Sequence, residues 1–255
     1  MKKTGIKSII LTVGVICLLL VAGYFIRQNS HVRFKDENMG IVICNTIGHG
    51  VTPENVRYKD LKKVQSLSIG CVGWYTTLLD IKKCANIKEL IINGYIHQSD
   101  PAYEVTQNEY GRELTEADSV WLEEELEMIV PKLKKLREFS YDAYAENSDI
   151  SSWDFLKLCP NLVHISIYNS DVTDYSFLNN FTGMKLLILK GCKVESADAL
   201  INLQDPERLC VYDTPLVESE EEIQKLCEAL PNTEILIEGG RIENDRDWDW
   251  SWRHE

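Results

Sequence analysis

The feature that most constrains the fold of this chain is a pattern with a 22-residue period. Ile150, Val172 and Val194 open three consecutive units, and matching apolar residues follow at the same offsets in each unit. Near its end each unit has a core of the form L-x-x-L-x-L, for example Met184, Leu187 and Leu189. One such unit cannot bury its apolar side alone, whereas stacked units share a continuous core. The period therefore predicts a solenoid.

The same core recurs outside the three matched units. Its further copies are Val64/Leu67/Ile69, Ile87/Leu90/Ile92, Leu136/Phe139/Tyr141 and Asn232/Ile235/Ile237, the last with a polar first position. Together with the matched units they predict seven strands. The apolar run Ile41–Cys44 is expected to form a capping strand before the first of them.

These repeats resemble the bacterial leucine-rich repeat proteins of the internalin-like class, which has a 22-residue period. That class carries an I-x-D-[I/L]-[S/T]-x-L segment on the back of each coil, and Val172–Leu178 matches it. The resemblance covers roughly residues 41–240 and implies an α/β fold, a leucine-rich repeat solenoid with a parallel concave sheet. It departs at the family's turn asparagine, where this chain has Ser170, Cys192 and Thr214. No particular internalin's partner therefore carries over.

The N-terminus contains an uncharged, mostly apolar run, Ser8–Ile26, which three lysines precede. As a helix it would be about 28 Å long, close to the thickness of the hydrocarbon layer. It predicts a single-pass membrane helix with the N-terminus in the cytoplasm and the following domain outside it. A cleaved signal peptide is the alternative, with Val21–Gly23 as its cleavage site.

The predicted layout has four parts. Residues 1–30 form the membrane anchor or signal peptide, and residues 31–40 form a linker. Residues 41–240 form the repeat domain, with an insertion at 97–130. Residues 241–255 form an acidic, tryptophan-rich cap or tail.

Charge and cysteine spacing exclude several functions. When residues 1–30 are left out, the basic count falls to 23 against 40 acids, a net charge of −17. Such a surface repels phosphate backbones, so no nucleic-acid partner is expected. The eight cysteines include no C-x-x-C pair and look like small core residues, so neither a metal nor a cofactor is expected.

The insertion is expected to contain a polar loop, residues 97–113, and then a helix. Leu122, Leu126 and Ile129 recur at helical spacing, with Glu123, Glu124, Glu125 and Glu127 on the solvent side. The helix is interpreted as a longer connector on the back of the coil. The loop either contacts a partner or has no function of its own.

The C-terminal tail alternates strictly, which places Trp248, Trp250 and Trp252 on one side of an extended segment. Solenoids need a cap over the exposed end of the core, and three indoles offer one. A partner-binding tail is the alternative.

A candidate binding site follows from the strand pattern. Residues between the inward leucines face the concave side, and the three middle coils gather tyrosine, basic and apolar side chains there. This mixture is typical of an interface that binds protein. The candidate residues are His164, Tyr168, Leu186, Ile188, Lys190, Arg208 and Tyr212.

Catalysis is not expected on this face. Cys210 and His164 lie two strands apart, about 10 Å at the usual strand spacing, and no Ser/His/Asp arrangement is evident. The sequence thus favours a non-enzymatic, protein-binding repeat protein anchored to a bacterial membrane, with an unidentified protein partner. A structural or envelope-organising protein without a discrete ligand is the alternative.

Overall fold

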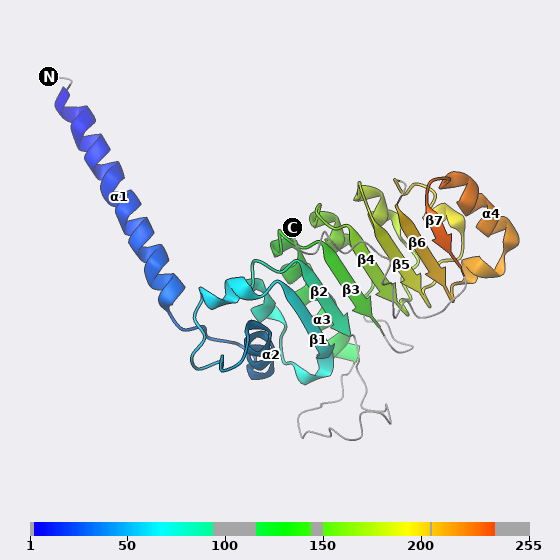
Figure 1. Ribbon diagram of the computed structural model, residues 1–255, viewed down its shortest axis with the longest axis horizontal. Helices are drawn as coiled ribbons and strands as arrows, with labels where there is room; N and C mark the ends of the chain where they lie inside the picture. Colours follow the sequence, from blue (N-terminus) through cyan, green and yellow to red (C-terminus); the bar gives the residue numbers. More distant parts are fainter. Residues whose placement is uncertain (1–2, 94–115, 144–149, 205, 238–255) are drawn as a thin grey trace.

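The computed structural model describes residues 3–93, 116–143, 150–204 and 206–237. Its centre is one sheet of seven parallel strands that lie side by side in chain order (Figure 1). The strands are β1 Ser66–Cys71, β2 Glu89–Asn93, β3 Glu138–Asp142, β4 His164–Tyr168, β5 Leu186–Lys190, β6 Arg208–Tyr212 and β7 Glu234–Leu236. Consecutive parallel neighbours are the arrangement expected of stacked coils, so the predicted leucine-rich repeat solenoid is confirmed.

The repeat pattern explains the register. The second residue of each strand pairs with the second residue of the next strand, and together these residues form one row across the sheet. The fourth residues form another row in the same way. Side chains in these rows point to the same face because strand residues alternate. They form the core between the sheet and the back of the coils, from Leu67 and Ile69 in β1 to Leu209 and Val211 in β6.

Short 3-10 helices form most of the back of the solenoid. They are η1 Asp60–Lys63, η2 Val72–Trp74, η3 Leu79–Lys83, η5 Val130–Lys132, η6 Asp154–Leu158, η7 Ser176–Asn180, η8 Ala197–Ala199 and η9 Pro215–Glu218. The repeated leucines are fully buried: Leu156 in η6, Leu178 in η7 and Leu200 directly after η8. A 3-10 helix rises about 2.0 Å per residue, so it covers the back of a coil with few residues.

The turn after each middle strand recurs with the same 22-residue period. Asn169, Gly191 and Asp213 all have positive φ, at 56°, 63° and 52°. Glycine, asparagine and aspartate are the residues that tolerate this conformation. Cys192, in place of the family's asparagine, directs its thiol to the Ile167 carbonyl at 3.3 Å. The substituted turn thus keeps a side-chain bond to the backbone.

The segment before β1 differs from expectation. Ile41–Cys44 is not a strand but lies within helix α2, Glu37–Ile47. Asp36 caps this helix by accepting a hydrogen bond from Met39 N, which favours a helical start. Residues 31–40 are not a free linker either, because Val32 and Met39 are buried in the core. The N-terminal cap is therefore a packed helix, built from the expected linker and capping strand.

Helix α1, Lys3–Asn29, extends away from the solenoid (Figure 1). Among the described residues it holds one stretch long and apolar enough to cross a membrane, Thr12–Asn29, and none of that stretch is buried within the protein. Its end contacts the first coil. Tyr24 Oη accepts a hydrogen bond from Lys62 Nζ at 2.9 Å, and the Arg27 guanidinium lies over the Tyr58 ring.

Helix α3, Glu116–Ile129, lies in the insertion and covers the back of the solenoid between β2 and β3. Leu122, Leu126 and Ile129 are buried, as the spacing predicted. The expectation for the four glutamates was wrong at Glu125, which is only 6% exposed. The predicted loop 97–113 lies outside the described residues.

The last coil has a helix on its back, α4 Glu220–Ala229, which Ser219 caps through Glu222 N. Leu226 and Leu230 pack from this segment into the core. The tail, residues 241–255, and its expected role as a cap lie outside the described residues.

Several cysteines are core residues, as expected. Burial raises the pKa of Cys84 to about 12 and the pKa of both Cys159 and Cys192 to about 11. Their thiols therefore stay protonated at neutral pH and serve as small apolar side chains.

Candidate protein-binding face

The sheet brings the seven predicted site residues together. His164, Leu186 and Arg208 pair in one row across β4, β5 and β6, and Tyr168, Lys190 and Tyr212 pair in another. Ile188 lies between the two rows, beside Cys210 of β6. All seven lie on the face opposite the core.

The structure corrects the expected exposure of this face. Leu186, Ile188, Cys210 and Tyr212 form an apolar cluster, the concave cluster, which is separate from the main core. Its members are only 3%, 6%, 0% and 5% exposed. Tyr168 packs against them and, like Lys190 and Arg208, is half-buried. The concave cluster was predicted as an open surface, and that prediction is wrong. The binding role of the seven residues stays a prediction.

Burial is uneven along the face. Ser66 and Ser68 of β1 and Asn93 of β2 are exposed. Ile91 of β2 occupies the same row as Ile188 and also has a strand on each side, yet it remains half-buried. The side chains beside the two residues differ, because Ile188 packs with Leu186, Cys210 and Tyr212 whereas Ile91 lies between two serines. The more exposed part of the face is at β1 and β2, and the more buried part, the covered part, runs from β4 to β6.

A buried polar group extends the covered part to β3. His164 Nδ1 lies 3.0 Å from Glu138 Oε1, and His164 Nε2 lies 2.8 Å from Ser166 Oγ. Glu138, His164 and Ser166 are 3%, 6% and 2% exposed. The sequence analysis missed this Ser/His/Glu arrangement. The pattern that could have indicated it is H-x-S, formed by His164 and Ser166 in β4, together with Glu138 at the position of β3 that pairs with His164.

The arrangement has the order of an acyl-transfer triad but lacks other parts of such a site. An acyl-transfer centre needs backbone or side-chain donors aimed at the developing oxyanion. Ser166 lies in the middle of β4, which is paired on both sides, so the sheet uses the backbone amides around it. The group brings three buried polar side chains into contact with one another, and its geometry alone supports no catalytic step.

The cations at the edges of the concave cluster lie beside acids. Arg208 Nε donates to Glu234 Oε2 at 2.7 Å, and Lys190 Nζ lies 3.7 Å from Asp213 Oδ2. Ion pairs as exposed as these contribute little to stability. A charged group of a partner protein can therefore replace the acid in either pair with little loss of free energy.

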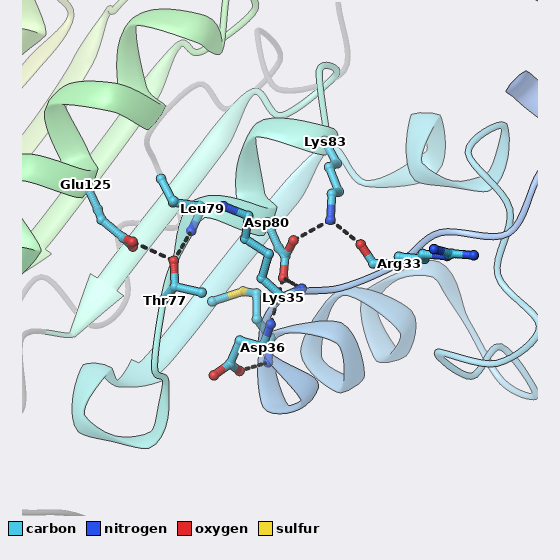
Figure 2. Close-up of polar contacts among 9 residues, drawn as sticks. Arg33, Lys35, Asp36, Thr77, Leu79, Asp80, Lys83 and Glu125 are labelled. Atoms are coloured by element: carbon cyan, nitrogen blue, oxygen red, sulfur yellow. Dashed lines mark hydrogen bonds and ion pairs between the residues drawn. The ribbon is translucent and has the colours of Figure 1, made fainter.

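A second polar cluster joins the N-terminal cap to the first coils (Figure 2). Asp80 accepts hydrogen bonds from the backbone amides of Lys35 and Asp36 at 2.6 and 3.0 Å, and it pairs with Lys83. Glu125 of α3 accepts from Thr77 Oγ1 and from the Leu78 amide. Because each carboxylate is occupied by donors from this chain, the cluster is structural. Among the described residues no group of His, Cys, Asp or Glu could hold a metal ion.

Comparisons with known proteins come from structure alone. No family model matches the chain, and no curated protein matches its sequence. Among solved structures the chain is similar to internalin C2 of Listeria monocytogenes, with 18% identity and a TM-score of 0.47, covering 82% of this chain and 88% of that one. It is also similar to the Listeria monocytogenes internalin inlF, with 16% identity and a TM-score of 0.48, covering 80% and 56%.

A leucine-rich repeat protein of Leptospira interrogans is similar at 14% identity and a TM-score of 0.44. That match covers 69% of this chain and 38% of the other, so this chain spans well under half of its length. These likenesses concern the fold alone. The assignment of this chain as a leucine-rich repeat solenoid rests on its own 22-residue period and on the register of its seven strands.

Proposed function

We propose that this protein is a bacterial, membrane-anchored repeat scaffold that binds another protein through its concave face. The observation that carries the proposal is the concave cluster. A solenoid needs apolar side chains only on the side of its sheet that faces the core. This sheet carries a second apolar group on the opposite, concave face. Apolar side chains flanked by tyrosine, lysine and arginine are typical of protein interfaces.

The anchor is proposed to be α1. Apolar side chains such as Leu18 and Ile26 are 70% and 72% exposed, which is unfavourable in water over a whole helix. Burial in a bilayer removes that penalty. The lysines before the apolar run favour a cytoplasmic N-terminus, which places the repeat domain outside the membrane. Because the end of α1 contacts Tyr58 and Lys62, the first coil is held close to the membrane surface.

The Ser/His/Glu group suggests acyl-transfer activity as a second class of function. The proposal of a non-enzymatic protein predicts that this activity is not present. A fluorophosphonate probe, which labels activated serines, is expected to leave Ser166 unmodified in the folded protein. Labelling of Ser166 that disappears in a His164→Ala variant would contradict the non-enzymatic proposal.

The binding proposal is tested by changing the edge of the concave cluster. Tyr168→Ala with Lys190→Glu alters two half-buried positions at the ends of β4 and β5. Because both positions flank the proposed interface, this variant should lose the proteins that co-purify with the full chain from solubilised membranes. The matched control is Leu158→Ala with Lys157→Glu on η6, at the back of the solenoid, where Leu158 is 58% exposed.

The alternative is a structural protein in which the repeats only separate the anchor from the tail. It predicts that both double variants retain the same co-purifying proteins. Loss in both variants would place the partner elsewhere on the solenoid and would also contradict binding through the concave face.

A further inference from the structure

We propose that the first coil and the end of α1 carry a basic surface that binds the anionic phospholipid headgroups around the anchor. This surface, the basic collar, consists of Arg27, Arg57, Lys59, Lys62 and Lys63. The proposal rests on the proposed role of α1 as a membrane anchor. It does not depend on the side of the membrane on which the coil lies, because it needs only anionic lipid in that leaflet.

Charge is divided unevenly along the chain. Residues 27–88, from the last turn of α1 to the residue before β2, contain 10 Lys and Arg against 5 Asp and Glu, a net charge of +5. Residues 89–255 contain 14 against 35, a net charge of −21. The end of the protein nearest α1 is therefore basic, although the protein as a whole is acidic. An anionic surface attracts the first part and repels the second.

The cations of the basic collar are exposed to solvent. In the described part of the chain Lys63 Nζ lies 3.7 Å from Asp60 Oδ1, with the lysine side chain 64% exposed. No ion pair holds Arg57 or Lys59 within those same residues. Exposed pairs contribute little to stability, so all of these charges are available to a ligand outside the protein.

Contacts with α1 set the depth of the basic collar. The apolar run ends at Ile26, and Gln28 lies about 3 Å farther along the helix at 1.5 Å per residue. The Gln28 carbonyl accepts a hydrogen bond from the Lys59 amide at 3.0 Å. Lys62 Nζ donates to the hydroxyl of Tyr24, within the apolar run, at 2.9 Å. The headgroup layer is about 5–8 Å thick, so both lysines lie at its level when α1 spans the bilayer.

Two tyrosines fit the same level. The Lys62 ammonium lies 5.4 Å from the centroid of the Tyr24 ring, and the Arg27 guanidinium lies 5.6 Å from that of Tyr58. Tyrosine is enriched where a membrane meets water, because its ring is apolar and its hydroxyl is polar. These contacts hold two cations of the basic collar at the border of the apolar run.

The position of the charge favours a membrane over other polyanions. The attraction of basic side chains to anionic lipid falls off within about 10 Å, and each one near the surface strengthens binding about fivefold. A long nucleic acid would also meet the negative charge of residues 89–255. A membrane meets only the end of the solenoid that α1 holds against it, where the cations are concentrated.

One consequence concerns the orientation of the solenoid. Its strands follow one another from β1, nearest α1, to β7, farthest from it (Figure 1). Attraction at the basic collar and repulsion of the acidic coils together turn the far end of the sheet away from the lipid. The concave cluster on β5 and β6 then stays accessible to a protein in solution.

The test uses the full chain in lipid nanodiscs of phosphatidylcholine alone, or of equal parts of phosphatidylcholine and phosphatidylglycerol. Lysines are acetylated with a neutral succinimidyl ester and quantified for each peptide. Lys59 and Lys63 are expected to react about fivefold more slowly with phosphatidylglycerol present. Lys193 and Lys225, on distant coils with side chains 56% and 41% exposed, are the internal reference and should not change.

Salt provides a second criterion. Raising it from about 0.1 M to 1 M shortens the screening length from about 10 Å to 3 Å and should remove the difference between the two lipids. Equal reactivity of Lys59 and Lys63 in both kinds of nanodisc would overturn the proposal.

Co-elution with the nanodiscs separates this proposal from that of the anchor. Co-elution at both compositions with equal lysine reactivity would refute the basic collar and leave the anchor standing. Co-elution only when phosphatidylglycerol is present would support the basic collar and contradict α1 as the anchor. No co-elution at either composition would refute both.

A variant tests which residues select the lipid. After solubilisation in an uncharged detergent, lipid retained by the unchanged chain should be enriched in phosphatidylglycerol. Arg57→Gln/Lys59→Gln/Lys63→Gln should lose this enrichment. The matched control makes the same change of charge on distant coils, Lys157→Gln/Lys193→Gln/Lys225→Gln, and should keep it. Equal enrichment in the two variants would contradict binding by the basic collar.

Discussion

At the scale of single residues, Asp80 shows how a buried carboxylate holds the N-terminal cap. Its side chain is fully buried, and it receives two backbone amides from the segment that precedes α2. The Lys83 ammonium balances its charge and also bonds the Arg33 carbonyl. The carboxylate therefore joins residues far apart in sequence, and its loss leaves several donors unpaired at once.

Replacing Asp80 with alanine is expected to lower the free energy of unfolding by about 1–3 kcal/mol or more, because buried donors lose their acceptor. Chemical denaturation in mild detergent, followed through tryptophan fluorescence, to which buried Trp153 contributes, measures the change. The control is Asp154→Ala, which breaks another Asp–Lys pair at the i,i+3 spacing, but with the Asp154 side chain 61% exposed. That variant should lose about 0–1 kcal/mol. Equal losses in the two variants would mean that the Asp80 contacts contribute little.

At the scale of elements, α3 is tied to the coil before it by one side chain. Glu125 accepts hydrogen bonds from Thr77 and from the Leu78 amide, and it is buried beside Leu122 and Leu126. A helix of mixed polarity thereby replaces a short 3-10 connector without opening the core. The contact orients α3 relative to η3, which begins at Leu79.

Glu125→Ala is expected to destabilise the protein by about 1.5–3 kcal/mol, the usual contribution of hydrogen bonds to a charged group. Hydrogen exchange should become faster at the Leu78 amide and along α3, while the strands β5 and β6 keep their protection. Glu124→Ala on the same helix, at an exposed position, is the control and should change neither quantity. Uniform loss of protection across the solenoid would contradict a local role.

At the scale of the whole molecule, helix α1 and the first coil of the solenoid are joined by backbone hydrogen bonds. Gln28, in the last turn of α1, and Ser30, directly after it, accept backbone hydrogen bonds from Lys59 and Tyr58 of the first coil. The chain therefore passes from α1 into the repeat domain without a free linker. The acidic solenoid extends from this junction, with a net charge of −17 beyond residue 30.

The mature protein is expected to retain residues 1–26 and to stay with the membrane fraction after alkaline carbonate washing. Intact-mass measurement and fractionation test both points. Leu19→Arg, in the middle of the apolar run, is the control and should release the protein, because arginine at the centre of a helix opposes insertion by about 2.5–3.5 kcal/mol. A mass that corresponds to a chain beginning at Tyr24 would show cleavage as a signal peptide.

The solenoid could be predicted from the amino-acid sequence, because the repeat pattern is local and periodic. Each L-x-x-L-x-L core specifies its inward rows through strand alternation, so the seven strands and their register could be predicted without any long-range contact. The candidate residues on the concave face could be placed on one surface for the same reason.

Which of those residues are buried depends on contacts that form when the chain folds. Ile188 and Ile91 occupy equivalent positions in their repeats, yet Ile188 is buried and Ile91 is half-buried. Ile188 packs with Leu186, Cys210 and Tyr212, whereas Ile91 pairs with Ser68 and Ser140 on the neighbouring strands. Glu125 is buried because its hydrogen-bond donors lie 47 and 48 residues earlier. Ile41–Cys44 is helical because Asp36 caps it while Met39 and Ile43 pack on the first coil. A repeat period carries no information about such contacts, since they occur only once in the chain.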